Sequence, residues 1–156
     1  MHPITVRKAT GADLETLERF EQAVVSAERP FDPTLGEGPI RYYDIAHMLE
    51  RDDVEFAVAE SGGKIVGCGF ARIEAAKPYL KHRRHAYLGL MYVEPQHRGD
   101  AVNGRIIDAL KRWCRSRDVA EMRLEAYADN LPAVRAYEKA GFSKLVIEMR
   151  MNLNDE

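Results

Sequence analysis

Residues 93–104 read VEPQHRGDAVNG and join an apolar, strand-like run at 86–93 to an amphipathic pattern that continues to about Arg117. One face of this predicted helix carries Val102, Ile106, Leu110, Trp113 and Cys114. The first turn of a helix has unpaired N–H groups and the positive end of the helix dipole, and small residues let an anion approach them closely. Arg98 adds a positive charge. The stretch therefore predicts a phosphate-binding turn, with an unliganded strand-to-helix turn as the alternative.

The rest of the chain predicts alternating strands and helices around this turn. Strands are expected at 4–7, 54–59, 65–73, 86–93, 121–127 and 143–151. Helices are expected from the cap residue Thr10 onward, from Pro39 to about residue 49, after the 93–104 turn, and from Asn130 to Ala140, where Gly141 ends the helix. Gly62-Gly63 is typical of a hairpin turn. This order predicts an α/β (α+β) fold, a mixed sheet with helices on both faces, formed by one domain over residues 1–156.

Composition limits the class of protein. The chain has 156 residues, 46% apolar and 31% charged, with a net charge of −2. A near-neutral charge gives no reason to expect a nucleic-acid or membrane partner, and no apolar run approaches the roughly 20 residues of a membrane span. Cys68 and Cys114 lack the spacing of a metal site or a disulfide framework, so both are expected to be buried and reduced. No metal is expected, and the cytoplasm is the expected location.

Two motifs, in order and on suitable elements, resemble those of the GCN5-related N-acetyltransferase (GNAT) superfamily. The first is Gln96-x-x-Gly99-x-Ala101, preceded by Val93-x-Pro95. The second comprises Asn130, Ala133, Tyr137 and Gly141-Phe142. The order of elements from Ile4 to Met151 also fits the family. The resemblance implies a mostly antiparallel, twisted sheet in which two neighbouring parallel strands, here 86–93 and 121–127, splay apart.

The resemblance also implies that the chain binds acetyl-CoA as an acyl donor. The main chain around Met91, Tyr92 and Val93 is then expected to bind the pantetheine arm. The pyrophosphate is expected at the N–H groups of Arg98, Gly99, Asp100, Ala101, Val102 and Asn103. Asn130 and Ala133 are expected near the thiol end of the cofactor. Two residues depart from the family pattern: Asp100 places a carboxylate in the turn, and Asn103 stands where glycine is frequent.

Tyr137 is the catalytic residue that the resemblance implies. A neutral amine attacks the thioester, an N–H group near Met91 stabilises the oxyanion, and the Tyr137 hydroxyl protonates the leaving thiolate. The alternative for Tyr137 is a structural aromatic packed beside Phe142. The sequence does not identify the base that deprotonates the amine. His85, Tyr87 and Glu125 are candidates, acting directly or through water, and a structural or solvated side chain is the alternative for each. The resemblance also allows for no dedicated base.

The acceptor is expected to contact the first two helices and the loop between them. Glu28, Asp32 or Asp44 could bind an ammonium group, Arg41 could bind a carboxylate, and Tyr43 adds an aromatic ring. The leading hypothesis is an N-acetyltransferase for a small amine or amino-acid-like acceptor. A protein or peptide N-terminal acetyltransferase and a non-catalytic acyl-CoA-binding module remain alternatives. A homodimer is compatible with the family, but no residue pattern indicates its interface.

Overall fold

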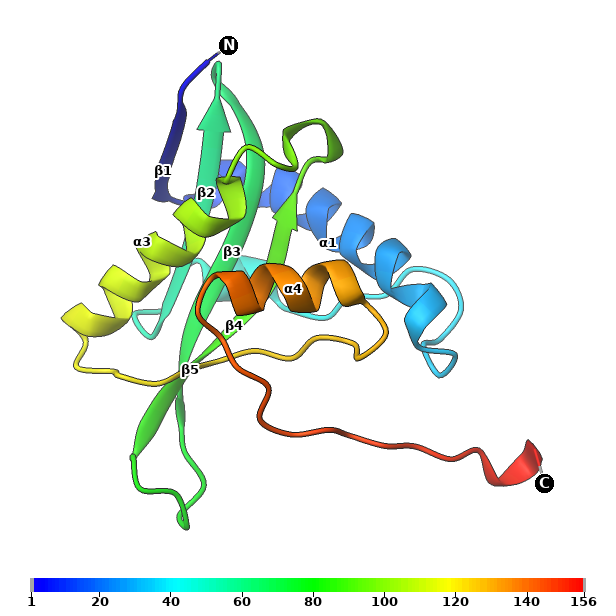
Figure 1. Cartoon of the computed structure of the whole chain (residues 1–156). Helices are drawn as coiled ribbons and strands as arrows, with labels where there is room; N and C mark the ends of the chain where they lie inside the picture. Colours follow the sequence, from blue (N-terminus) through cyan, green and yellow to red (C-terminus); the bar gives the residue numbers. More distant parts are fainter. Residues whose placement is uncertain (1, 156) are drawn as a thin grey trace. The chain divides into compact units, whose positions relative to one another are not determined.

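The structure is a computed structural model that describes residues 2–155 and divides the chain into two compact units, one ending at Glu125 and one beginning at Ala126. The first unit contains a five-stranded sheet in the order β1 (Ile4–Lys8), β2 (Val54–Ser61), β3 (Lys64–Ala75), β4 (Arg84–Val93) and β5 (Met122–Arg123). Neighbouring strands are antiparallel except β4 and β5, which are parallel (Figure 1). The predicted mixed, mostly antiparallel sheet is confirmed.

The turn between β2 and β3 shows how local sequence sets this sheet. Gly62 and Gly63 both have positive φ, +57° and +80°, as a two-residue turn between twisted antiparallel strands requires. Ser61 pairs with Lys64 and Glu60 with Ile65 next to the turn, and the register then shifts by one residue between Glu60 and Ala59. The predicted hairpin is therefore confirmed.

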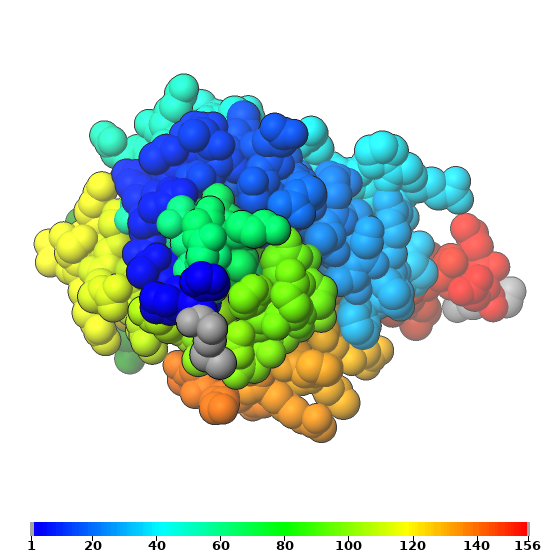
Figure 2. Space-filling view, turned by 90° about the horizontal axis from the view of Figure 1, so that it is seen from above, coloured from blue at the N-terminus to red at the C-terminus, as the bar shows by residue number. Residues whose placement is uncertain are grey.

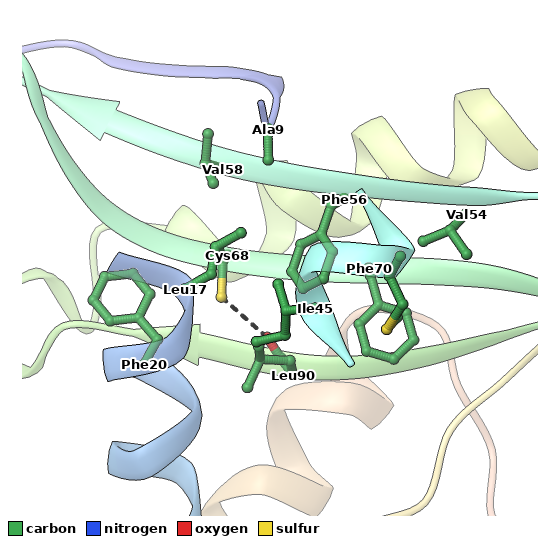
Figure 3. Close-up of a cluster of buried hydrophobic side chains, with 11 residues drawn as sticks. Ala9, Leu17, Phe20, Ile45, Val54, Phe56, Val58, Cys68, Phe70 and Leu90 are labelled. Carbon is green, nitrogen blue, oxygen red and sulfur yellow. Dashed lines mark hydrogen bonds between the residues drawn. The ribbon is translucent and has the colours of Figure 1, made fainter. Parts of the chain in front are cut away.

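Helices cover both faces of the sheet, and successive residues of β3 face them in turn. Cys68 and Phe70 point toward α1 (Leu14–Glu28) and the short α2 (Ile45–Met48), while Gly67 and Gly69 lie against Ile106 of α3 (Val102–Ser116). The core on the α1 face gathers side chains from helices and strands (Figure 3): Leu17, Phe20, Ile45, Phe56, Val58, Cys68, Phe70 and Leu90. Cys114 is buried on α3, so both cysteines are buried and free, as predicted.

The first helical segment begins after Thr10, as its sequence predicts, with a 3₁₀ turn (Gly11–Asp13) that runs directly into α1. The carboxylate of Asp13 accepts a hydrogen bond from the Thr10 N–H at 2.8 Å, which satisfies a donor at the helix start. The same carboxylate receives two hydrogen bonds from Arg7 of β1, at 2.8 and 3.0 Å. This capping residue therefore also joins the helix to the edge strand.

The predicted helix over residues 39–49 is wrong in its extent, because only Ile45–Met48 is helical. The N–H groups of Tyr42 and Tyr43 donate to the carboxylate of Glu21 instead of to helix carbonyls, and residues 39–43 have no regular secondary structure. Asp44 then caps the short helix by accepting a hydrogen bond from the His47 N–H. A side chain distant in sequence thus decides where this helix begins.

Two predicted strands also differ from the structure. The strand expected at 121–127 is reduced to Met122–Arg123, and residues 143–151 form no strand. The second unit contains α4 (Leu131–Lys139) and a short 3₁₀ turn (Leu153–Asp155), and none of its described residues forms a strand. The apolar residues Leu145, Val146, Ile147, Met149 and Met151 are accordingly exposed. A segment of apolar residues needs a partner strand before it forms a ladder.

Candidate functional site

A β-bulge in β4 opens the sheet beside β5. Phe70 pairs with Gly89 and Cys68 pairs with Tyr92, so two residues of β4, Leu90 and Met91, lie opposite one residue of β3. Leu90 has a positive φ of 46°, which is unusual for a residue with a side chain. Its carbonyl accepts a hydrogen bond from the Cys68 thiol at 3.2 Å (Figure 3). The bulge is thus stabilised from within the core.

The bulge reverses which backbone groups of β4 face β5. Before it, the Ala86 N–H donates to the Glu121 carbonyl on the β5 side; after it, the Glu94 N–H donates to the Val66 carbonyl on β3. Because backbone groups alternate along a strand, Met91 and Val93 face the β5 side and Tyr92 faces β3. Parallel pairing with β5 covers only Ala86 and Tyr87. Within residues 2–125, no strand pairs with β4 on that side beyond Tyr87, so the two strands splay apart there.

The turn after β4 presents a group of unpaired N–H groups. A 3₁₀ turn (Pro95–His97) leads to Gly99, with φ of +92°, and to Ala101, with φ of +60°, immediately before α3. Among residues 2–155, no hydrogen bond is found for the N–H groups of Gly99, Ala101, Val102, Asn103 and Gly104. The space beside Gly99 is open, since a Cβ atom there would meet nothing within 4 Å. This arrangement can bind a phosphate through backbone donors and the helix dipole.

Asp100 and Arg98 have partners within the turn. The Asp100 carboxylate lies 3.5 Å from the His97 imidazole, and the Arg98 guanidinium contacts the Val93 carbonyl at 3.4 Å. Both contacts direct the side chains back toward the start of the turn. Arg19 of α1 lies 3.4 Å from Glu94, and the view from above shows the turn (lime green) beside the blue surface of α1 (Figure 2).

Tyr43 reaches the splayed region from the loop between α1 and α2. Its ring packs edge-on against Phe70 with centroids 4.9 Å apart, and its hydroxyl lies over Gly89, the residue immediately before the bulge. Burial raises the pKa of Tyr43 and that of the neighbouring Tyr87, with which it interacts. Arg72 lies over the Tyr87 ring at 5.4 Å. An aromatic and hydroxyl-bearing surface therefore adjoins the bulge.

The charged residues expected to bind the acceptor differ in the contacts that they already make within the protein. Arg41 lies 2.6 Å from Glu18, and Asp32 accepts hydrogen bonds from the N–H and hydroxyl of Thr34. Asp44 caps α2, as described above. Burial raises the pKa of the Glu28 carboxyl, which interacts with the Tyr42 hydroxyl. Of these acids, Glu28 is the one whose environment favours an added positive charge.

The candidate bases lie at different places. Burial lowers the pKa of His85, and its imidazole is 3.1 Å from that of His82 and 3.9 Å from the Glu74 carboxylate. Tyr87 lies two residues further along β4, close enough to Glu125 for the carboxylate to raise the phenol pKa further, in addition to burial. A raised pKa keeps the Tyr87 phenol protonated at neutral pH, so Tyr87 could act only as a relay.

The second unit carries the other predicted motif. The Asn130 side chain caps α4 by accepting a hydrogen bond from the Ala133 N–H at 3.4 Å. At the other end, Gly141 has φ of +111°, and the N–H groups of Phe142 and Gly141 donate to the carbonyls of Tyr137 and Glu138. This is a Schellman motif, in which the rings of Tyr137 and Phe142 also pack at 6.0 Å. The spacing of the motif thus has a structural explanation as well as a functional one.

Sequence reasoning missed two features. The β4 bulge has no local signal, because Leu90 and Met91 are ordinary strand residues. Glu21 is fully buried, and its position was detectable: it lies four residues after Leu17, on the apolar face of α1. Among residues 2–155, no group of three or more His, Cys, Asp or Glu side chains could hold a metal ion. Nor does this part of the chain contain a helix with the length and apolarity to cross a membrane.

Comparison with known proteins identifies relatives. A family model described as "Acetyltransferase (GNAT) family" matches residues 20–142. An IAA acetyltransferase of Azospirillum brasilense is 26% identical over 129 residues, 80% of this chain and 79% of that protein. An N-alpha-acetyltransferase of Sulfolobus acidocaldarius is 24% identical over 90% of this chain and 80% of its own. The crystal structure of a predicted acetyltransferase with acetyl-CoA from Clostridium acetobutylicum has a TM-score of 0.72 at 21% identity, covering 99% of both chains.

Proposed function

The chain belongs to the acetyltransferase (GNAT) family, and we propose that it transfers the acetyl group of acetyl-CoA to a primary amine of a small or amino-acid-like acceptor. The observation that carries this proposal is the turn at 99–104, where five N–H groups are unpaired next to the open edge of β4. Such a surface suits a cofactor with a pyrophosphate and an amide-containing arm, as CoA has. The comparison structure with acetyl-CoA supports the same donor.

We assign the pyrophosphate to the N–H groups of residues 98–103 and the pantetheine arm to the main chain of Met91 and Val93. The backbone of Tyr92 faces β3, so its part is limited to its side chain. Asp100 points to His97 and therefore adds little repulsion to a bound phosphate. Asn103 contributes its N–H group. The family motif, rather than geometry, supports roles for Asn130 and Ala133 near the thiol.

The proposed reaction is direct transfer. The amine nitrogen forms a bond to the thioester carbon, and the oxyanion receives a hydrogen bond from an N–H group near Met91. The ammonium nitrogen of this tetrahedral intermediate loses a proton to water or to a nearby base. The carbon–sulfur bond then breaks to give the amide, Tyr137 donates its proton to the CoA thiolate, and the Tyr137 phenolate regains a proton from solvent. Glu125, through Tyr87, is the base candidate whose surroundings best support a relay.

On the acceptor side, we propose that Glu28 binds a positive charge and that Tyr43 forms part of the wall. An ammonium near Glu28 would stabilise its ionised form, which burial disfavours. Asp32 would contribute a more distant negative charge. Arg41 would bind an acceptor carboxylate by exchanging its present partner, Glu18, for it.

Thiol release from acetyl-CoA across a panel of glucosamine, spermidine, L-lysine, kanamycin and short peptides with free N-termini tests this proposal. Turnover with a small amine supports it. Turnover with peptides alone would favour the second candidate, an N-terminal acetyltransferase. The Sulfolobus relative, named N-alpha-acetyltransferase, is the reason for testing this candidate. Thermal stabilisation by acetyl-CoA with no turnover on any acceptor would favour a binding module.

Two further properties stay predictions within this proposal. We keep the cytoplasm as the location, where acetyl-CoA is available, and cell fractionation checks it. We also keep open a homodimer, which sedimentation of the purified protein would detect. Neither is needed for the proposed chemistry.

A further inference from the structure

Glu21 is a buried carboxylate that the proposed chemistry does not use. Its side chain is 0% exposed, on the face of α1 that also buries Leu17, Phe20 and Val25. Among residues 2–155, the buried charged residues are Glu21 and Asp13, and Asp13 has Arg7 as a close partner. A buried carboxylate is costly unless hydrogen bonds compensate it, so the bonds of Glu21 indicate what holds it there.

Those bonds go to the main chain of the acceptor-side loop. One oxygen of Glu21 accepts the N–H groups of Tyr42 and Tyr43, at 3.1 and 3.0 Å. The other oxygen has no hydrogen-bond partner among the described residues and lies 3.7 Å from the Arg41 guanidinium. Glu21 is therefore bound to two consecutive peptide groups of a segment that has no regular secondary structure.

Neighbouring residues of α1 hold the same segment. Gln22 donates to the Ile40 carbonyl at 2.7 Å, and Glu18 forms the exposed ion pair with Arg41. Residues 40–43, the 40–43 segment, are thus attached to one helix by three side chains. Glu21 differs from the other two because it is buried and because its two bonds are to the N–H groups nearest the Tyr43 ring.

The position of Tyr43 depends on this attachment. Its ring packs on Phe70, and its hydroxyl lies over Gly89, next to the bulge where β4 leaves β5. A small rotation of the peptide between Tyr42 and Tyr43 would move that hydroxyl, since it is the most distant atom of the side chain. No other hydrogen bond from the Tyr43 N–H is found among residues 2–155.

We propose that Glu21 is a positioning residue for the acceptor. By binding the N–H groups of Tyr42 and Tyr43 from within the core, it holds the Tyr43 hydroxyl beside the bulge of β4, where the acceptor amine meets the acetyl group. This inference rests on the proposed acetyl transfer and adds a residue that touches neither substrate. It assigns the specificity of this region to a buried helix residue as well as to the loop surface.

The experiment compares Glu21→Leu, which fills a similar volume without an acceptor, with Glu21→Gln, which keeps one. We expect Glu21→Leu to raise the KM of the best acceptor of the panel at least about tenfold and to leave the KM for acetyl-CoA within about twofold. Glu21→Gln should restore most of the acceptor KM. Glu15→Gln is the control on the same helix, and its KM values should equal those of the wild type because Glu15 is exposed and makes none of the contacts described for the 40–43 segment.

A double-mutant cycle with Tyr43→Phe tests the route of the effect. If Glu21 acts through the Tyr43 hydroxyl, Glu21→Leu should change the acceptor KM much less in the Tyr43→Phe background than in the wild type. Additive effects would overturn the route through Tyr43. Equal increases in the KM for acceptor and for acetyl-CoA would show a general structural role instead.

Amide hydrogen exchange separates this inference from the proposed function. In the wild-type protein the N–H groups of Tyr42 and Tyr43 should exchange slowly, and in Glu21→Leu they should exchange at least about tenfold faster. Fast exchange in the wild type overturns the inference even if Glu21→Leu does not fold. Slow exchange combined with no acetyl transfer to any amine would leave the attachment intact and refute its proposed role together with the proposed function.

Discussion

The hydroxyl of Tyr43 lies directly over the backbone of Gly89: a Cβ atom on Gly89 would be 2.8 Å from that oxygen and would overlap the ring of Phe70 even more. The strand residue before the bulge therefore has to be glycine for the 40–43 segment to lie where it does. This contact connects the 40–43 segment, on the proposed acceptor side, to β4, whose unpaired edge is the proposed binding site of acetyl-CoA.

Gly89→Ala is expected to lower the free energy of unfolding by about 1–3 kcal/mol, because the added methyl group overpacks a region that Phe70 and Tyr43 already fill. It should also raise the KM for the acceptor. Urea unfolding and steady-state kinetics measure the two effects. Gly11→Ala is the control, since a Cβ there meets nothing within 4 Å, and its stability should stay within about 0.5 kcal/mol of the wild type. Equal stability for both variants would contradict the packing argument.

Gly99→Glu should abolish the binding of acetyl-CoA, because it adds a side chain and a negative charge where the pyrophosphate is proposed to approach the backbone. The φ of +92° adds strain to any such substitution. Gly38→Glu is a matched control in an exposed loop, with φ of +78° and the same added charge. Isothermal titration with acetyl-CoA should detect binding in the control alone. A folded Gly99→Glu protein that binds normally would show that the pyrophosphate lies elsewhere.

Tyr137→Phe should lower kcat by roughly 10- to 1000-fold and leave the affinity for acetyl-CoA nearly unchanged, as loss of a general acid predicts. The substitution keeps the ring, so the contact with Phe142 at 6.0 Å is retained. Phe142→Leu perturbs that contact and keeps the hydroxyl, so it should affect stability more than kcat. An unchanged rate in Tyr137→Phe would leave the residue with its structural role alone.

Acid should lower the free energy of unfolding, because it protonates the Asp13 carboxylate. Hydrogen bonds from Arg7 hold the pKa of this carboxyl below its usual value, so the folded state binds fewer protons than the unfolded chain near that pH. The resulting stability is complete above the unfolded pKa of about 4 and is lost as the pH falls through the lower, folded pKa.

Asp13→Asn should therefore cost about 1–3 kcal/mol at pH 7, and the difference from the wild type should shrink at pH 3. Urea unfolding at both pH values measures it. Asp53→Asn is the control, because its pairing with Arg51 is exposed and its loss should change stability clearly less than the loss of the buried Asp13 pair. A difference that is the same at both pH values would mean that Asp13 acts without its charge.

Local patterns predicted the elements that local forces can specify. The Thr10 start of the first helix, the Gly62-Gly63 turn, the amphipathic α3 and the Gly141 end of α4 were all readable, because each depends on residues within a few positions. The family resemblance, carried by residues 96–101 and 130–142, also led to the correct fold and family.

Long-range contacts decided the remaining features. The helix expected from Pro39 begins only at Ile45 because Glu21, more than 20 residues earlier, binds the N–H groups of Tyr42 and Tyr43. The strand expected at 143–151 is rich in apolar residues, yet in the described second unit no strand is present to pair with it. A pattern of apolar residues specifies which face can be buried, and the partner has to come from elsewhere in the fold.

The turn at 93–104 shows where the two kinds of information meet. Its sequence alone determined a glycine turn before an amphipathic helix, because backbone freedom and helical periodicity are local properties. Only the tertiary structure decided that Met91 and Val93 face the open side of β4, because the bulge at Leu90 reverses the alternation of the strand. That reversal depends on how β4 pairs with β3 and how Cys68 binds the Leu90 carbonyl, and hydrogen bonds between strands are formed only in the folded chain.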